Sequence, residues 1–210
     1  MIRLATVFSG IGAIEHALER MNINYEIIFS CDIDERVKKS FFANYNITED
    51  RWYRDIHGID GSKYFNQVDL FVGGSPCQSF SMVGKRKGLR DDRGLLIFEF
   101  ARLVNEIKPK IFIYENVKGL VNHDSGKTWK IIKEEFSKLQ YTYFDNVLNA
   151  KNYGLPQNRE RLFVVGFKDY VSFEFPPKIP LKIKMKDLLE DNPDNKYYLG
   201  EKGIDFVTKV

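Results

Sequence analysis

The chain has 210 residues, of which 43% are hydrophobic and 29% charged, and its formal net charge is +3. This composition is ordinary for a globular protein, and the length fits one large domain or one domain with a tail. Two cysteines are too few for the disulfide framework of a small secreted protein, and no Cys/His spacing predicts a zinc site. No apolar run reaches the roughly 18 residues that a membrane helix needs. We therefore expect a cytoplasmic protein without a bound metal.

Apolar runs and amphipathic stretches alternate along most of the chain. The predicted strands are residues 4–9, 26–33, 68–74, 111–117, 141–150 and 161–167, with a weak strand before Asp55. The predicted helices are residues 11–21, 35–45, 95–107 and 126–140. Asp34 is expected to cap the second helix, and Pro109 to end the third. The alternation predicts an α/β fold with a doubly wound, mostly parallel, Rossmann-like sheet.

The character of the sequence changes after about residue 168. Pro176, Pro177 and Pro180 interrupt the chain, several lysines follow, and residues 191–195 are rich in turn formers. We expect residues 1–168 to form the functional domain and residues 169–210 to form an appendage that leaves the sheet. A short helix near residues 185–190 is the only element expected there.

The first predicted strand runs into a glycine turn, Phe8-Ser9-Gly10-Ile11-Gly12, which leads into a helix. The N-terminus of a helix after such a turn can bind an anionic group through backbone N–H groups. Asp32 lies 20 residues after Gly12, where a carboxylate can accept hydrogen bonds from ribose hydroxyls. Glu15 replaces the third glycine of the dinucleotide fingerprint, which favours a nucleoside carrying an amino-acid group over a pyrophosphate. An ordinary tight turn and a helix-capping aspartate are the alternative.

The residues most able to bind a ligand or to react cluster at one predicted edge of the sheet. In parallel sheets ligands bind at the carboxyl ends of the strands. Six residues fall at or just past a predicted strand end, namely Gly10, Gly12, Asp32, Asp55, Cys77 and Glu115. Cys77 follows two glycines and Pro76 on a polar loop, where a thiolate can form and be reached. An inert, buried cysteine is the alternative for Cys77.

Five segments in order resemble the motifs of cytosine-5 DNA methyltransferases. They are FSGIGAIE at the first turn, GGSPCQSFS around Cys77, the charged block GKRKGLRDDRG, Glu115-Asn116-Val117 and QNRER at residues 157–161. The resemblance covers about residues 4–167. Two positions depart from it: Ala13 stands where many members have a glycine, and Ile33 stands where many have an aromatic residue.

The resemblance implies an S-adenosylmethionine-dependent methyltransferase fold. It also implies methyl transfer from S-adenosylmethionine to carbon 5 of a flipped-out cytosine in double-stranded DNA, through a covalent adduct with Cys77. The catalytic residues it implies are Cys77, Gln78, Glu115, Arg159 and Arg161, with Arg161 preferred for contact with the base. The cofactor residues it implies are Phe8, Ser9, Gly10, Gly12, Asp32, Ile33, Asp55, Ile56 and Pro76. The implied DNA-binding lid contains Ser81, Lys85, Arg86, Lys87 and Arg93.

The family usually continues with a long recognition segment and a last motif that contains Gly-Asn-Ser, and this sequence holds neither. We therefore expect the fold to be incomplete at its C-terminus, and the chain to be a fragment or one subunit of a split enzyme that needs a complementing partner. The open alternatives are a cofactor-binding module without turnover, a dehydrogenase, a cysteine hydrolase and an RNA substrate. The sequence suggests no partner for His16, His57 or His123.

Overall fold

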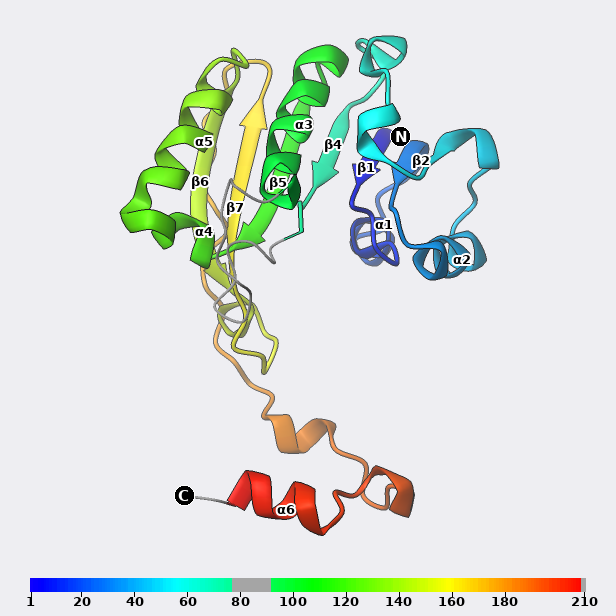
Figure 1. Cartoon of the computed structure of the whole chain (residues 1–210), viewed down its shortest axis with the longest axis vertical. Coiled ribbons are helices and arrows are strands. Elements are labelled where there is room, and N and C mark those ends of the chain that lie inside the picture. The colour runs from blue at the N-terminus through cyan, green and yellow to red at the C-terminus, as the bar shows by residue number, and fades with distance from the viewer. Residues whose placement is uncertain (77–91, 209–210) are drawn as a thin grey trace. The chain divides into compact units, whose positions relative to one another are not determined.

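A computed structural model describes residues 1–76 and 92–208 (Figure 1). The chain divides into two compact units. The first consists of Met1–Asn149 and Glu160–Pro177, and the second of Ala150–Arg159 and Lys178–Val210. The predicted functional boundary at residue 168 is a statement about roles, and it stays a prediction.

The first unit contains a seven-stranded sheet with the strand order β3-β2-β1-β4-β5-β7-β6. Neighbouring strands among β3, β2, β1, β4 and β5 pair in parallel, whereas β7 is antiparallel to both β5 and β6. The mostly parallel α/β fold predicted from the sequence is therefore confirmed. The strands are β1 Ile2–Val7, β2 Tyr25–Cys31, β3 Trp52–Tyr53, β4 Leu70–Gly73, β5 Ile111–Val117, β6 Thr142–Asn149 and β7 Glu160–Phe167.

All four predicted helices are present with shifted ends. They are α1 Ala13–Arg20, α2 Glu35–Asn44, α3 Asp92–Ile107 and α5 Lys127–Ser137. The Asp34 side chain caps α2, as predicted, by accepting a hydrogen bond from the N–H of Arg36. Among the described residues, two α-helices were not predicted, α4 Gly119–Asn122 and, in the second unit, α6 Glu201–Thr208. The helix expected near residue 185 is a single 3₁₀ turn, Met185–Leu188. No helix of the described residues is long and apolar enough to cross a membrane.

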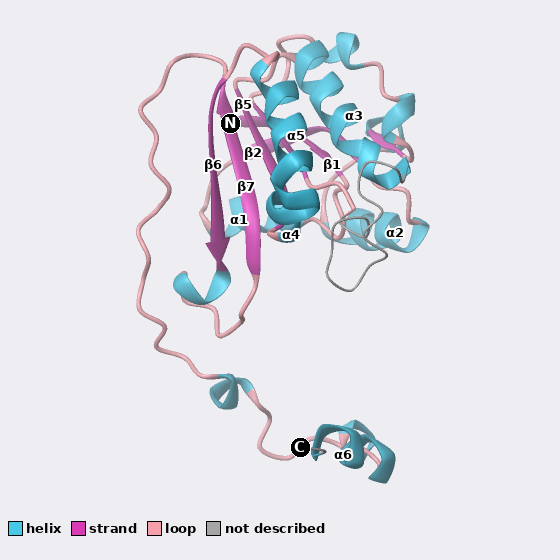
Figure 2. Cartoon of the chain, turned by 60° about the vertical axis from the view of Figure 1, so that its left-hand side comes forward, coloured by secondary structure: helices cyan, strands magenta, loops and turns pink. Residues whose placement is uncertain are grey.

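Alternation of side chains along the strands assigns the helices to the two faces of the sheet. Leu4 and Val72 point to one face and pack against Leu18 of α1. Their strand neighbours Ala5 and Phe71 point to the other face, where the core includes Phe100 of α3 and residues of α5. Ile27 pairs with Leu4 and packs against Phe41, so α2 shares the face of α1. Figure 2 shows α3 and α5 lying together over their face.

The parallel strands end at one common edge. Val7, the last residue of β1, pairs with Cys31 on one side and with Gly73 on the other, and these residues end β2 and β4. The glycine turn, Asp32 and the Gly74–Pro76 segment therefore leave the sheet side by side. This arrangement brings together segments that are more than sixty residues apart in the sequence.

Candidate active site

The glycine turn after β1 has an unusual backbone. Phe8, Gly10 and Gly12 have φ angles of 55°, 56° and 90°, all in the left-handed region. Glycine adopts these angles at little cost, but Phe8 does not, and such strained residues cluster at functional sites. Tyr45, at the end of α2, donates a hydrogen bond of 2.8 Å from its hydroxyl to the carbonyl of Gly12. The turn is thus fixed by a side chain 33 residues away in sequence.

Asp32 ties this turn to the second helix. One carboxylate oxygen accepts a hydrogen bond from the Gly10 N–H at 2.9 Å, and the other accepts one from the Asp34 N–H at 3.0 Å. The helix-capping alternative for Asp32 is wrong, because Asp34 is the residue that caps α2. Asp32 stabilises the local backbone, and it also lines the pocket described next.

A pocket of about 560 Å³ lies at the carboxyl ends of β1 and β2. Its size is within the usual range for a small-molecule site, and most of its lining is apolar. Six predicted cofactor residues line it, namely Phe8, Asp32, Ile33, Asp55, Ile56 and Pro76. The other three, Ser9, Gly10 and Gly12, are not among the lining residues. Sequence reasoning missed four lining residues, namely Cys31, Arg54, His57 and Leu96.

His57 has a partner that the sequence analysis did not find. Its Nδ1 lies 2.7 Å from Oδ1 of Asp55, and its backbone N–H donates to the same oxygen at 3.0 Å. The backbone N–H of His57, followed by its side chain, lowers the pKa of Asp55. An Asp that binds the residue two positions later is a common turn, and this local pattern was the available signal. His123 also has a partner, because its Nδ1 lies 2.7 Å from Oγ1 of Thr128.

A buried polar network lies between β1 and the first turn of α1. The Thr6 hydroxyl lies 2.9 Å from the hydroxyl of Ser9, 3.0 Å from that of Ser30 and 3.1 Å from Oε1 of Glu15. Glu15 is fully buried, and its Oε2 has no hydrogen-bond partner among the described residues. Burial raises the pKa of Glu15, because an ionised carboxylate loses its hydration there. Ionisation of this carboxyl group therefore costs more free energy in the folded chain than in water.

We expect Glu15→Gln to be less destabilising, relative to wild type, at pH 8 than at pH 4, because the neutral amide removes the cost of ionising a buried carboxyl group. In the unfolded chain Glu15 ionises near 4.5, the ordinary pKa of a glutamate, whereas the folded state resists ionisation. Its contribution to stability is therefore present below pH 4.5 and lost as pH rises towards the folded pKa. Urea unfolding at several pH values measures the slope of the free energy of unfolding against pH. Glu134→Gln, on the exposed face of α5, is the control that should leave the slope unchanged.

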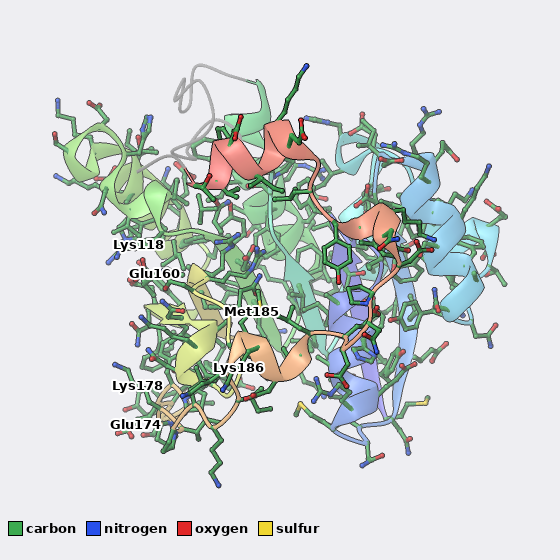
Figure 3. All side chains as sticks on the ribbon, turned by 90° about the horizontal axis from the view of Figure 1, so that it is seen from below. Lys118, Glu160, Glu174, Lys178, Met185 and Lys186 are labelled. Atoms are coloured by element: carbon green, nitrogen blue, oxygen red, sulfur yellow. The ribbon has the colours of Figure 1, made fainter. Side chains whose placement is uncertain are left out.

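Two ion pairs join the end of β5 to the start of β7. Nε of Arg161 lies 3.0 Å from Oε1 of Glu115, and the side chains are 22% and 33% exposed. Nζ of Lys118 lies 3.0 Å from Oε1 of Glu160 (Figure 3). The antiparallel register places Arg161 opposite Val117 and Phe163 opposite Glu115. The structure thus brings together Glu115 and Arg161, two of the predicted catalytic residues.

Gly74 passes close to Glu115. A Cβ atom at position 74 would lie 2.9 Å from Oε2 and 3.0 Å from the backbone carbonyl oxygen of Glu115, closer than side chains tolerate. Pro76, two residues later, lines the 560 Å³ pocket. The Gly74–Pro76 segment therefore runs from the Glu115 carboxylate to the pocket.

Several predicted site residues lie outside the described residues or in the second unit. Cys77 and Gln78 lie outside the described residues, as do Ser81, Lys85, Arg86 and Lys87 of the predicted lid; the backbone of Arg93 belongs to α3, but its side chain is outside the described part of the chain. Arg159 belongs to the second unit, where its carbonyl accepts a hydrogen bond from the N–H of Ala150. Within the described residues no group of His, Cys, Asp or Glu could hold a metal ion.

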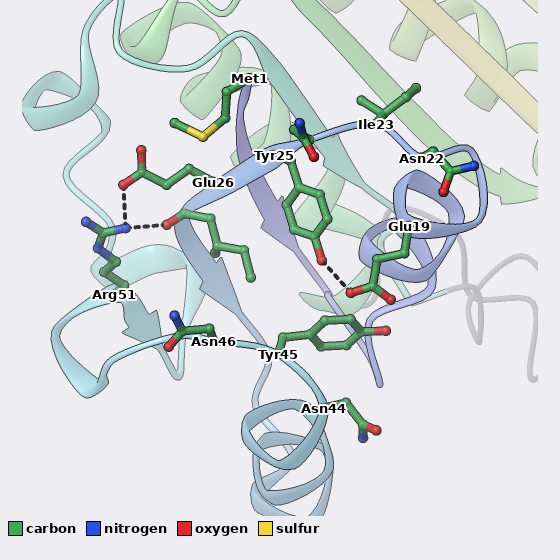
Figure 4. Close-up of a pocket in the computed structure, with 12 residues that line it drawn as sticks. Met1, Glu19, Asn22, Ile23, Tyr25, Glu26, Asn44, Tyr45, Asn46 and Arg51 are labelled. Atoms are coloured by element: carbon green, nitrogen blue, oxygen red, sulfur yellow. Dashed lines mark hydrogen bonds and ion pairs between the residues drawn. The ribbon is translucent and has the colours of Figure 1, made fainter.

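A larger pocket, of about 830 Å³, lies at the other end of β2 (Figure 4). Tyr25 begins β2 and donates a hydrogen bond to Glu19 at 3.1 Å, and Arg51 pairs with Glu26 at 3.0 Å. This pocket opens at the amino end of the parallel strand, whereas ligands of such sheets bind at the carboxyl ends. The smaller pocket is therefore the better candidate for the active site.

Comparisons with known proteins identify the family. A family model described as C-5 cytosine-specific DNA methylase matches residues 2–209. The chain belongs to this family. The orphan methyltransferase M.SPRI of Bacillus phage SPR is 40% identical over 95% of this chain and 52% of that protein. The type II methyltransferase M.SsoII of Shigella sonnei is 39% identical over 95% of this chain and 52% of that protein. The chain spans about half the length of these curated relatives.

Solved structures agree on the fold. The S. pombe Dnmt2 methyltransferase superposes with a TM-score of 0.75 at 19% identity, covering 98% of this chain and 66% of that one. A putative DNA modification methyltransferase from an Escherichia coli prophage gives a TM-score of 0.68 at 25% identity, covering 92% of this chain and 56% of that one. Membership of the C-5 cytosine-specific DNA methylase family favours a methyltransferase over the dehydrogenase and cysteine hydrolase considered from the sequence.

Proposed function

We propose that this chain carries the cofactor-binding and catalytic part of a cytosine-5 DNA methyltransferase, with Cys77 as the nucleophile. One observation supports this most strongly. Gly74 lies against the Glu115 carboxylate and Pro76 lines the pocket, so the segment leading to Cys77 connects the two. A nucleophile attached to the end of this segment would be close to both a bound cofactor and an acid–base group.

The pocket fits S-adenosylmethionine by its chemistry. Its walls are mainly apolar, which suits an adenine ring, and Asp32 and Asp55 offer carboxylates to hydroxyl and amino groups. We propose that Asp32 binds the ribose and that Asp55 and Ile56 bind the adenine. When bound, this cofactor supplies a methyl group on a positively charged sulfur.

The chain's own residues would activate the base. The Cys77 thiolate forms a bond to carbon 6 of cytosine, and the displaced electron pair makes carbon 5 nucleophilic. Glu115 holds a proton at ring nitrogen 3, and Arg161 orients Glu115 through their ion pair. Carbon 5 would then accept the methyl group as its bond to the sulfonium sulfur breaks, and the electron pair of that bond would stay on the sulfur as a neutral thioether. Loss of the carbon 5 proton and cleavage of the carbon–sulfur bond restore the ring and release the thiolate.

We propose double-stranded DNA as the substrate, with the target cytosine flipped out of the helix. The cations of residues 85–93 would contact phosphates. We propose that Arg161 also contacts the target base and that Arg159 has a supporting role. Because the chain spans about half the length of its curated relatives, we also propose that a complementing segment contributes to specific methylation.

Transfer of a labelled methyl group tests this function. With labelled S-adenosylmethionine, DNA and the complementing segment, we expect label in 5-methylcytosine, and Cys77→Ser should lower the rate at least a thousandfold. Cys31 cannot substitute for Cys77, because burial raises the pKa of its thiol to about 12. Label in another base, or full activity of Cys77→Ser, would refute the proposal. Cofactor binding without any transfer would favour a module without turnover.

A further inference from the structure

A fully buried hydrogen-bonded triangle lies just beyond the end of β4. The Tyr114 hydroxyl is 2.6 Å from the hydroxyl of Ser75 and 2.7 Å from Nδ2 of Asn116. Tyr114, Ser75 and Asn116 are 0%, 5% and 1% exposed. Nδ2 of Asn116 also reaches the carbonyl of Ser75 at 3.2 Å. The triangle therefore joins β5 to the segment that follows β4.

The direction of these hydrogen bonds can be assigned. Oδ1 of Asn116 accepts a hydrogen bond from the N–H of Val117, which fixes the amide so that Nδ2 points to the triangle. An amide nitrogen only donates, so the Tyr114 oxygen accepts from Asn116. The single hydroxyl proton of Tyr114 can then be donated to Ser75. Tyr114 is thus the central link, and phenylalanine at this position would break both bonds.

The triangle holds the chain in place just beyond the last residue pair of β4 and β5. The last residue pair between β4 and β5 is Gly73 with Tyr114, so no ladder pairing holds Gly74, Ser75 or Pro76. These are the residues that pass Glu115 and reach the pocket. A shift of the reacting groups by about 1 Å can cost a hundredfold in rate. The side-chain bonds to Ser75 are therefore well placed to set this geometry.

We infer that Tyr114 is a positioning residue for methyl transfer: through Ser75, its hydroxyl fixes the carboxyl end of β4 against Glu115. This inference rests on the proposed function. It adds a residue outside the motif residues assigned above, and it predicts an effect on turnover rather than on cofactor binding. Of the two bonds that Tyr114→Phe removes, the one to Ser75 anchors the segment, and the loss of one bond of ordinary strength corresponds to about a tenfold fall in rate.

The test compares Tyr114→Phe with Tyr141→Phe in the enzyme at its natural length. Tyr141 is also buried, and its hydroxyl also donates one hydrogen bond, to the carbonyl of Pro109 at the opposite end of the sheet. We expect kcat to fall about tenfold in Tyr114→Phe, with the Kd for S-adenosylmethionine changed by less than about twofold. Tyr141→Phe should lose comparable stability and keep kcat. Equal kcat values for the two variants would overturn the inference.

Two further measurements separate positioning from loss of stability. Ser75→Ala should slow the reaction to a similar degree, and the double variant should be no slower than Tyr114→Phe, because the pair acts as one unit. Amide hydrogen exchange at Gly74 and Ser75 should speed up in Tyr114→Phe and not in Tyr141→Phe. Unchanged exchange would refute the anchoring. If exchange speeds up in Tyr114→Phe but the wild-type enzyme transfers no methyl group, the proposed function is refuted and the anchoring is not.

Discussion

Replacement of Glu115 by glutamine is expected to slow methyl transfer by about a hundredfold to ten-thousandfold, the usual range for loss of a general acid. Glutamine has the same shape and keeps an oxygen that can accept from Nε of Arg161. It cannot hold or give up a proton at a ring nitrogen. The loss should therefore fall on kcat, with cofactor affinity little changed, in single-turnover assays with labelled cofactor.

A carboxylate at the other end of the sheet supplies the matched control. Glu26 pairs with Arg51 at 3.0 Å, the same distance as in the Glu115–Arg161 pair, and it lines the pocket at the amino end of β2. Glu26→Gln should leave the rate within about twofold of wild type, because exposed ion pairs contribute little. A wild-type rate for Glu115→Gln, or an equal loss in both variants, would exclude the proton-holding role.

Gly12→Ala is expected to destabilise the fold by about 3 kcal/mol or more and to abolish cofactor binding. The added Cβ would lie 2.0 Å from the Tyr45 ring, and the φ angle of 90° is unfavourable for any L side chain. Left-handed backbone alone costs alanine about 1–2 kcal/mol, and the clash adds the cost of an overpacked contact. Urea unfolding and cofactor titration measure the two effects.

Gly10→Ala separates backbone strain from the clash. Gly10 has a φ of 56°, but a Cβ there would meet nothing within 4 Å. It should therefore cost only the backbone term of about 1–2 kcal/mol. The double variant Gly12→Ala/Tyr45→Ala should regain part of the stability lost in Gly12→Ala, because the ring is gone. If Gly10→Ala and Gly12→Ala cost the same, the contact with Tyr45 does not constrain the turn.

The sequence predicted those features that local pattern determines. Buried runs and helical periodicity indicated the order of strands and helices, and the glycines marked the turn after β1. The end of each element was less certain, because it depends on pairing with a neighbouring strand: β4 ends at Gly73, which pairs with Val7, the last residue of β1. The short helix α4 and the exposed helix α6 carry too few buried positions to produce a clear period.

Contacts across the fold could not be predicted from one sequence. The packing of Tyr45 on Gly12, and the bond between Ser75 and Tyr114, depend on strand order and register. Glu15 was noted for the glycine it replaces, but its burial beside Thr6 follows from the packing of α1 on β1. The pair of Asp55 and His57 is different, because its two residues are two positions apart and the contact is local.

Covalent trapping on DNA that contains 5-fluorocytosine tests the central claim most directly. Fluorine at carbon 5 cannot leave as a proton does, so a sulfur bonded to carbon 6 stays attached after methyl transfer. With S-adenosylmethionine and the complementing segment present, peptide mass spectrometry should locate the adduct on Cys77, and Cys77→Ser should form none. An adduct on another residue, or methylation of ordinary DNA without any trapped adduct, would contradict the account.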